Sequence, residues 1–196
     1  MFDFRQLVCD VAQELLEATI KIGGVAIRLT ETEAYAGVDD PAAHAVRGRR
    51  PTTEALFGPP GTLYCYLSYG VHICANLVCE AEAGGSAVLL RAGDVIEGIE
   101  LARHRRSSGQ AKLIPDAQLA RGPGNLGLAL GLSLQHSGWQ AGQDFEVVPR
   151  LSVPEITCGP RVGVSVANAR EWRYWITGAA SVSSYSRSPR AVPNSW

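Results

Sequence analysis

The sequence predicts an α+β fold, in which a curved, mostly antiparallel sheet resembling an open barrel is surrounded by helices. Three observations lead to this prediction. The chain has 196 residues, which is enough for one domain with a substantial core. Short strand-like segments and a few amphipathic segments follow one another between turn residues. No internal repeat, linker or low-complexity stretch divides the chain, so residues 1–196 are expected to form a single domain.

The N-terminal part predicts a helix followed by a hairpin. Apolar residues recur at helical spacing over roughly 5–17. A strand at 18–22, the turn Gly23-Gly24 and a strand that begins at residue 25 then form the hairpin.

Polar side chains interrupt the second strand of this hairpin. If the strand continues, side-chain alternation places Glu31, Glu33 and Tyr35 on the face that carries Val25, Ile27 and Leu29. Two carboxylates and a phenol are costly in a core. Such a conflict marks a candidate functional site, although a face that reaches solvent would explain it equally well.

The middle of the chain predicts a long loop and a strand-rich stretch. Residues 36–61 are rich in Gly and Pro, and a loop of this length is more often functional than idle. Strands are predicted at 63–69, 71–78 and 87–91. Asp94 and Glu97 have the spacing of a capping box and predict a helix through about Arg105.

The C-terminal part predicts one more helix and then short strands. Pro123 is suited to the first turn of a helix over about 123–130, despite its glycines. Short strands are predicted at 145–148, 162–166, 172–177 and 181–185.

The composition is that of an ordinary soluble globular protein, with 46% hydrophobic and 19% charged residues. No apolar run approaches the ~20 residues of a membrane span, and the N-terminus lacks a signal-peptide pattern. The five cysteines form no C-x-x-C pair, and we expect reduced core thiols in a reducing compartment. Neither metal-ligand spacing nor a G-x-x-x-x-G-K sequence occurs, so no metal and no cofactor is expected.

The net charge is −1, but the basic residues are unevenly distributed. Arg47, Arg49 and Arg50 form one run, and Arg103-His104-Arg105-Arg106 with Lys112 forms another. Arginine suits forked contacts with phosphates. A charge run is also typical of a solvated face, so these runs predict modest affinity for DNA at most.

Seven short motifs follow one another along nearly the whole chain: ETEAY (31–35), a DxxAAH-like segment that ends at His44, PGTLYCYLSYG (60–70), AN (75–76), LLRA (89–92), RGPGNL (121–126) and RVGV (161–164). In this order they resemble the alkyladenine (3-methyladenine) DNA glycosylase family, the monofunctional base-excision enzymes. One such motif would be weak support, whereas seven in order are strong.

The resemblance implies a base-flipping mechanism, because breaking the bond between C1′ and the base requires the nucleotide to leave the stack. By this resemblance, Glu33 orients and deprotonates water and stabilises the positive charge on the sugar. Arg91 and the backbone at Val162 help to hold that water. The family match assigns the flipped base to the side chains Tyr35, His44 and Tyr66, the rejection of guanine to Asn76, and intercalation into the vacated space to Tyr69.

Glycosylases that also nick the strand form a Schiff base through an amine. This chain has only Lys21, in a predicted hairpin, and Lys112, in a basic stretch. Water is therefore the expected nucleophile, and an intact abasic strand is the expected product.

The expected partner is double-stranded DNA with a damaged purine: 3-methyladenine, 7-methylguanine, hypoxanthine or ethenoadenine. No membrane partner is expected. The enzyme is expected to be a monomer in the cytoplasm, at the bacterial nucleoid, or in the nucleus of a eukaryote.

Two other classes of function remain open. A non-catalytic damage-binding module would use the same aromatic platform without turnover. A hydrolase of small nucleosides would use Glu31 and Glu33 as an acid–base pair. Taken singly, the candidate residues also have ordinary explanations: strand aromatics for Tyr64, Tyr66 and Tyr69, a loop histidine for His44, an ion pair for Arg91 and a turn cap for Asn76.

Overall fold

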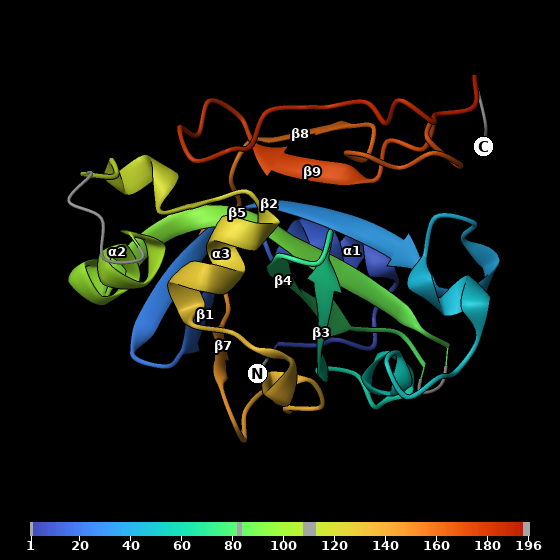
Figure 1. The fold of residues 1–196 in the computed structure, drawn as a ribbon, viewed down its shortest axis with the longest axis horizontal. Helices are drawn as coiled ribbons and strands as arrows, with labels where there is room; N and C mark the ends of the chain where they lie inside the picture. The colour runs from blue at the N-terminus through green and yellow to red at the C-terminus, as the bar shows by residue number, and fades with distance from the viewer. Residues whose placement is uncertain (1, 82–83, 108–112, 194–196) are drawn as a thin grey trace.

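The computed structural model describes residues 2–81, 84–107 and 113–193 (Figure 1). Its framework is a pair of long strands, β2 (Val25–Ala36) and β5 (Ser86–Glu97), which run antiparallel along most of their length. Both strands are rich in branched apolar residues, which pack well on a pleated surface. The polar stretch at 31–35 therefore lies within β2, as the sequence predicted.

The remaining strands extend this pair into one sheet. The main strand order is β3-β4-β5-β2-β1-β7, with β1 (Thr19–Ile22), β3 (Leu63–Ser68), β4 (His72–Val78) and β7 (Glu146–Val148). β6 (Ala120–Arg121) pairs with β5, while β9 (Arg173–Ile176) pairs with β2 and with β8 (Ile156–Gly159). All pairings between these strands are antiparallel. In the described part of the chain the sheet does not close.

In the described part of the chain, three α-helices pack on the sheet. α1 (Val8–Glu14) lies against β2, where the Thr32 hydroxyl donates to the carbonyl of Ala12 at 2.8 Å. α2 (Ile99–Ser107) and α3 (Pro123–Leu130) lie together at one end of β5 (Figure 1). With the sheet they form a single α+β domain, as predicted. None of the described helices is both long enough and apolar enough to cross a membrane.

The long loop after β2 is built from short 3₁₀ turns: η1 (Gly37–Asp39), η2 (His44–Arg47) and η3 (Glu54–Phe57). It covers a second, smaller apolar cluster that includes Ala45, Phe57 and Tyr64. Two more 3₁₀ turns, η4 (Asp116–Gln118) and η5 (Leu134–His136), lie later in the chain.

A β-bulge changes which residues of β2 share a face. The pairing with β5 skips Thr30 on β2, and two further register shifts skip Ile96 and Arg91 on β5. Ala34 accordingly belongs to the same buried cluster as Ile27 and Leu29, whereas Tyr35 packs against the second cluster. The prediction that Glu31, Glu33 and Tyr35 share the face of Val25, Ile27 and Leu29 is therefore wrong, because a bulge reverses the alternation.

Three other predicted elements are wrong. Asp94 and Glu97 lie in β5, where pairing with β2 overrides the capping-box pattern, and α2 begins only at Ile99. Residues 162–166 and 181–185 form irregular structure and are not strands. β6 and β8 were missed, because two and four residues are too short for a clear alternation.

The cysteines are all free thiols, but their positions vary. Cys65, Cys74 and Cys79 are buried, as predicted, whereas Cys9 is half-buried and Cys158 is exposed.

The close approach of α3 to β4 generates a stability prediction. A Cβ on Gly127 would lie 2.0 Å from the carbonyl oxygen of Ile73. Gly127→Ala improves helix propensity by ~1 kcal/mol, but we expect a net loss because overpacking costs ~1–3 kcal/mol. The melting temperature should fall by several degrees in thermal unfolding. Leu128→Ala, on the exposed side of α3, is the control, and a Gly127→Ala variant as stable as the parent would contradict this packing.

Candidate active site

The register of the sheet brings the candidate residues onto one face. Glu33 lies opposite Leu89, Leu89 opposite Asn76, and Asn76 opposite Tyr64. On the other side of β2, Glu33 lies opposite Arg173. Residues directly opposite one another share a face, so the acidic segment of β2 and the tyrosine-rich hairpin β3–β4 face the same side of the sheet.

Glu33 is fully buried, and donors hold both of its oxygens. The backbone N–H of Val162 donates to Oε1 at 2.7 Å, and the Tyr35 hydroxyl donates to Oε2 at 2.8 Å. Nη1 of Arg91 lies 3.4 Å from Oε2. These contacts fix the orientation of the carboxyl group.

Tyr35 acts as a donor in this arrangement. Burial raises the pKa of its phenol well above the ordinary value, and the negative charge of Glu33 raises it further. The hydroxyl therefore stays protonated at physiological pH and can keep its hydrogen bond to Glu33.

Glu31 is a different kind of carboxylate, because its oxygens are saturated by protein groups. Nε of Arg91 and Nε of Arg173 each lie 2.7 Å from Oε1. The hydroxyl of Ser183 donates to Oε1 at 2.9 Å, and its backbone N–H donates to Oε2 at 2.7 Å. Burial alone would raise the pKa of Glu31, but the charges of Arg91 and Arg173 and the N–H of Ser183 hold it below its ordinary value. Glu31 thus anchors Arg91 and ties the C-terminal segment to the sheet.

The loop between β2 and β3 brings His44 to the tyrosines of β3. Nδ1 of His44 lies 3.0 Å from the Tyr64 hydroxyl, and its ring is 4.5 Å from that of Tyr66, edge to face. Burial of the imidazole and the charge of Arg47 lower the pKa of His44. Burial also raises the pKa of Tyr64 to about 12, so both rings are neutral at pH 7.

Asn76 and Tyr69 occupy contrasting positions on the hairpin. The side-chain amide of Asn76 is buried and donates to the carbonyl of Tyr64 at 3.1 Å, which fixes its orientation. Tyr69 is 92% exposed at the hairpin tip and has a φ of 51°. A bulky residue rarely adopts this left-handed conformation. Here the tight turn of the hairpin accounts for it: the N–H of Val71 donates to the carbonyl of Ser68 at 3.1 Å, and both central residues, Tyr69 and Gly70, have a positive φ.

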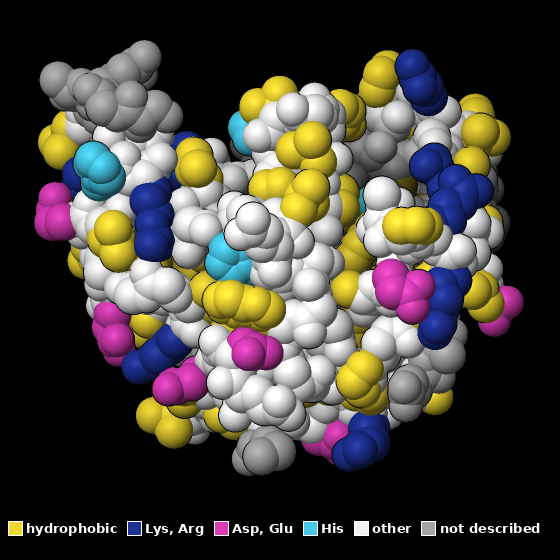
Figure 2. Space-filling view, turned by 60° about the horizontal axis from the view of Figure 1, so that its bottom comes forward, with side chains coloured by type: hydrophobic (Ala, Val, Ile, Leu, Met, Phe, Trp, Pro, Cys, Tyr) yellow, Lys and Arg dark blue, Asp and Glu magenta, His cyan; other side chains and the backbone are white. Residues whose placement is uncertain are grey.

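The arginines of the two basic runs differ in their partners and in their exposure to solvent. In the run 103–106, the arginine side chains donate to backbone carbonyls. Arg103 donates to Ile114, and Arg106 donates to Leu119. Arg105 donates to both Ala129 and Gly23. In the loop run, Arg47 and Arg50 are exposed, while Arg49 is close to Glu54. Figure 2 shows Lys and Arg gathered on the side of the molecule where Figure 1 places this loop.

Lys21 offers no amine at this site. Lys21 pairs with Glu97 of β5 at 3.0 Å. Glu97 is eight residues along β5 from Leu89, the residue opposite Glu33. At ~3.3 Å per residue this places the Lys21 pair about 25 Å from Glu33. Lys112 lies outside the described residues.

Four residues that the sequence interpretation did not single out belong to this cluster: Asp40, Arg161, Arg173 and Ser183. Arg161 and Asp40 lie in recognised motifs, and a charged residue inside a motif is a signal that could have marked them. Arg173 and Ser183 carry no comparable signal, because only long-range contacts place them beside Glu31: the pairing of β9 with β2 for Arg173, and the hydrogen bonds of the segment after β9 for Ser183.

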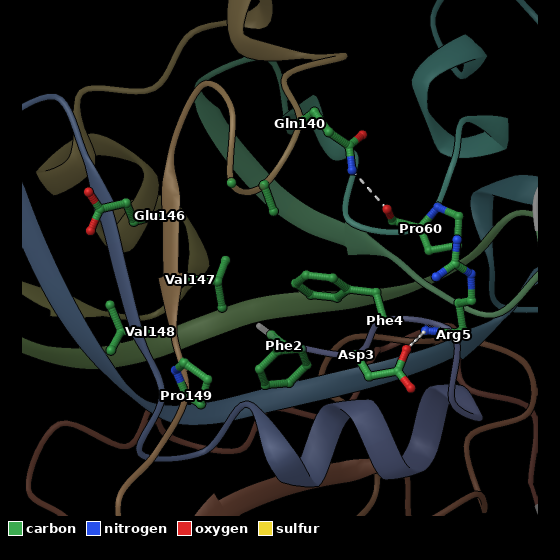
Figure 3. A pocket seen from close by; sticks show the side chains of 12 residues that line it. Phe2, Asp3, Phe4, Arg5, Pro60, Gln140, Glu146, Val147, Val148 and Pro149 are labelled. Atoms are coloured by element: carbon green, nitrogen blue, oxygen red, sulfur yellow. Dashed lines mark hydrogen bonds between the residues drawn. The ribbon is translucent and has the colours of Figure 1, made fainter.

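A separate cavity of about 360 Å³ lies away from this cluster (Figure 3). Its walls come from the N-terminal residues, Pro60 and Gln140, and β7 with Pro149. The rings of Phe2 and Phe4 lie 4.7 Å apart there, and the lining includes none of the candidate active-site residues.

The family model described as methylpurine-DNA glycosylase (MPG) matches residues 2–180. The chain therefore belongs to this family, and it is a DNA glycosylase. Three bacterial relatives are each named "Putative 3-methyladenine DNA glycosylase". The protein of Corynebacterium jeikeium is 47% identical over 195 residues, which cover 93% of this chain and 90% of the relative. The protein of Nocardia farcinica is 45% identical, and the match covers 95% of this chain and 92% of the relative. The protein of Cutibacterium acnes is also 45% identical, and the match covers 93% of this chain and 98% of the relative.

The Glu31 network predicts a pH-dependent loss of stability. Glu31→Gln removes the carboxylate that pairs with Arg173 and leaves Arg91 with Glu33 as its charged partner. Breaking a buried ion pair costs ~3–5 kcal/mol. Because the folded-state pKa of Glu31 is lowered, its contribution is complete above ~4.3, the ordinary value for glutamate, and is lost as the pH falls further.

Urea unfolding of the parent and Glu31→Gln at pH 7 should therefore show a large difference in the free energy of unfolding, which narrows below pH ~4. Glu97→Gln, which removes an exposed pair with Lys21, is the matched control. Equal stabilities of parent and Glu31→Gln at pH 7 would refute the anchoring role.

Proposed function

We propose that the protein removes alkylated or deaminated purines from duplex DNA and leaves an intact abasic strand, as an early step of base excision repair. Its substrates would be 3-methyladenine, 7-methylguanine, hypoxanthine and ethenoadenine. One observation carries the proposal: a fully buried glutamate, Glu33, is oriented by two donors and an arginine beside a group of aromatic rings. The bacterial relatives support action in the cytoplasm on nucleoid DNA, and we propose that the enzyme acts there as a monomer.

Glu33 has the geometry for activating water. A carboxylate offers about four acceptor positions, and Val162 and Tyr35 occupy two of those on Glu33. A remaining position can accept a hydrogen bond from water, which Glu33 would orient and deprotonate. Its negative charge would also stabilise the positive charge that develops on the sugar. Since the N–H of Val162 is engaged with Glu33, the carbonyl of Val162 and Arg91 are the groups left to hold this water.

The aromatic residues would hold the flipped base. Tyr35 donates to Glu33, and the rings of His44 and Tyr66 lie 4.5 Å apart. All three rings are neutral at pH 7, because burial raises the pKa of Tyr66, as it does that of Tyr35, and lowers the pKa of His44. Neutral π-faces attract positively charged alkylpurines, which provides selectivity for such lesions. Asn76, fixed by Tyr64, would exclude guanine by a clash with its 2-amino group.

Tyr69 would fill the gap that the flipped nucleotide leaves. It stands at the exposed tip of the hairpin, between Leu67 and Val71, which are 50% and 73% exposed. Apolar or aromatic wedges of this kind separate base steps in other duplex-distorting proteins. Arg47 and Arg50, exposed in the loop beside the site, are suited to contacts with the phosphates.

The alternative functions are less well supported. A nucleoside hydrolase would need Glu31 as a proton donor, yet Glu31 is fully engaged and its pKa is lowered, so it remains ionised at pH 7. A damage-binding module would need no buried carboxylate beside an arginine, and burying such a charge costs stability.

The first functional prediction concerns Glu33. Glu33→Gln should keep the fold, because the amide oxygen can still accept from Val162, and it should still bind lesion-containing DNA. Base release under single turnover should fall by ~10² or more, the usual contribution of a positioned acid–base group. Glu97→Gln, remote and exposed, should retain the parent rate; excision by Glu33→Gln at the parent rate would show that another group activates water.

The second functional prediction separates base flipping from chemistry. Tyr69→Asn suits the left-handed backbone but removes the ring that offsets the unstacking cost of a few kcal/mol. Excision from duplex DNA should therefore fall much more than excision from a single strand of the same sequence. Glu33→Gln should slow both substrates alike. Equal effects of Tyr69→Asn on the two substrates would place the wedge elsewhere.

A further inference from the structure

Arg161 is a buried cation next to the active site. It lies two residues after β8, and its side chain is fully buried, as is that of its partner Asp40. Nη2 of Arg161 donates to Oδ1 of Asp40 at 3.0 Å, and Nη1 donates to Oδ2. Among the described residues, Nε of Arg161 has no hydrogen-bond partner. A buried ion pair with an unpaired N–H is weak support for a purely stabilising role.

The same guanidinium holds β2 at the point where the active-site residues follow one another. Nη1 donates to the carbonyl of Ala34 at 3.0 Å, and Ala34 lies between Glu33 and Tyr35. The guanidinium carbon lies 4.6 Å from the centre of the Tyr35 ring and 5.3 Å from that of Trp172. A planar, delocalised cation can stack on rings and donate in its own plane at once, which lysine cannot do.

Both uncharged donors to Glu33 are attached to groups that Arg161 restrains. The N–H of Val162, the residue after Arg161, donates to Oε1 of Glu33. The hydroxyl of Tyr35, whose ring stacks on Arg161, donates to Oε2. The orientation of the carboxylate is thus linked on two sides to the position of one guanidinium.

We propose that Arg161, held by Asp40, is a positioning residue of the glycosylase reaction: it fixes the two donors that orient Glu33. The inference rests on the proposed role of Glu33 as the group that activates water. Arg161 would act through Tyr35 and Val162 and would touch neither the sugar nor the base.

Removing this restraint should impair the chemical step much more than recognition, because Tyr35 is one of three rings proposed to hold the base, whereas both uncharged donors to Glu33 depend on Arg161. Arg161→Lys keeps the charge opposite Asp40 but loses the fork and the stacking on Tyr35. Since small misplacements of a catalytic group can cost on the order of 10²-fold, we expect base release to fall by ~10- to 100-fold. The dissociation constant for lesion-containing duplex should change by less than ~3-fold.

A double-mutant cycle with Glu33→Gln provides the test, because residues that act through one another are not additive. Single-turnover base release would be measured for the parent, each single variant and the double variant, on the lesion that the parent releases fastest. If Arg161 acts through Glu33, Arg161→Lys has no further effect in the Glu33→Gln background. An equal fold-loss in both backgrounds, or no loss in either, would overturn the proposal.

Two further variants separate a loss of activity from a loss of stability. Asp40→Asn/Arg161→Gln removes both charges of the buried pair. Arg170, whose Nη1 lies 3.5 Å from Oδ1 of Asp40, remains as a cation that is partly exposed to solvent. This double variant should show the same rate loss as Arg161→Lys. Ile20→Ala, a fully buried residue of β1, is the control for lost stability and should keep the parent rate while folded. If both Arg161 variants fail to fold while Ile20→Ala folds, Arg161 is a stability residue and the proposal fails.

The cycle also separates this inference from the proposed function. A parent that releases no base, or a Glu33→Gln variant as fast as the parent, contradicts the proposed function itself. An active parent with an impaired Glu33→Gln and an unimpaired Arg161→Lys contradicts only the positioning role.

Discussion

The burial of two carboxylates, two residues apart on β2, is the constraint on which this site depends. Glu31 and Glu33 are both fully buried, and the effective penalty for an unpaired buried ion is several kcal/mol. Arginines from β5 and β9 balance the charge of Glu31. Glu33 keeps acceptor capacity that its two donors do not use. Two identical side chains on one strand thus have different surroundings, which suit Glu31 to anchoring the sheet and Glu33 to the chemical role proposed for it.

Much of the fold could be predicted, because local patterns coincide with the elements. The alternation in β2, the hairpin β3–β4 and the proline at the start of α3 all follow such patterns. The failures have a common cause in tertiary pairing. Asp94 belongs to a strand because it faces Arg28, with which it pairs at 3.2 Å. The bulge at Thr30 reverses the alternation in β2, and periodicity alone does not reveal it.

The ordered motifs named several residues that lie close together in the structure, such as Glu33, Tyr35 and Arg91. The sequence did not show how they are held. Glu31 appeared as a possible acid–base partner, but Arg173 and Ser183 saturate it. The run Arg103–Arg106 suggested contacts with DNA, yet these arginines bind backbone carbonyls around α2 and α3. Such assignments depend on contacts between segments far apart in the chain, which composition and spacing do not encode.

The most direct test of the central claim is a product analysis with duplex DNA that carries one of the four lesions. Released base would be measured by chromatography, strand integrity by a denaturing gel, and covalent intermediates by borohydride trapping. With Glu33 directing water to the sugar, free base should appear together with a full-length abasic strand, and no trapped complex should form. Tight binding without released base, or a trapped protein–DNA complex, would contradict this account.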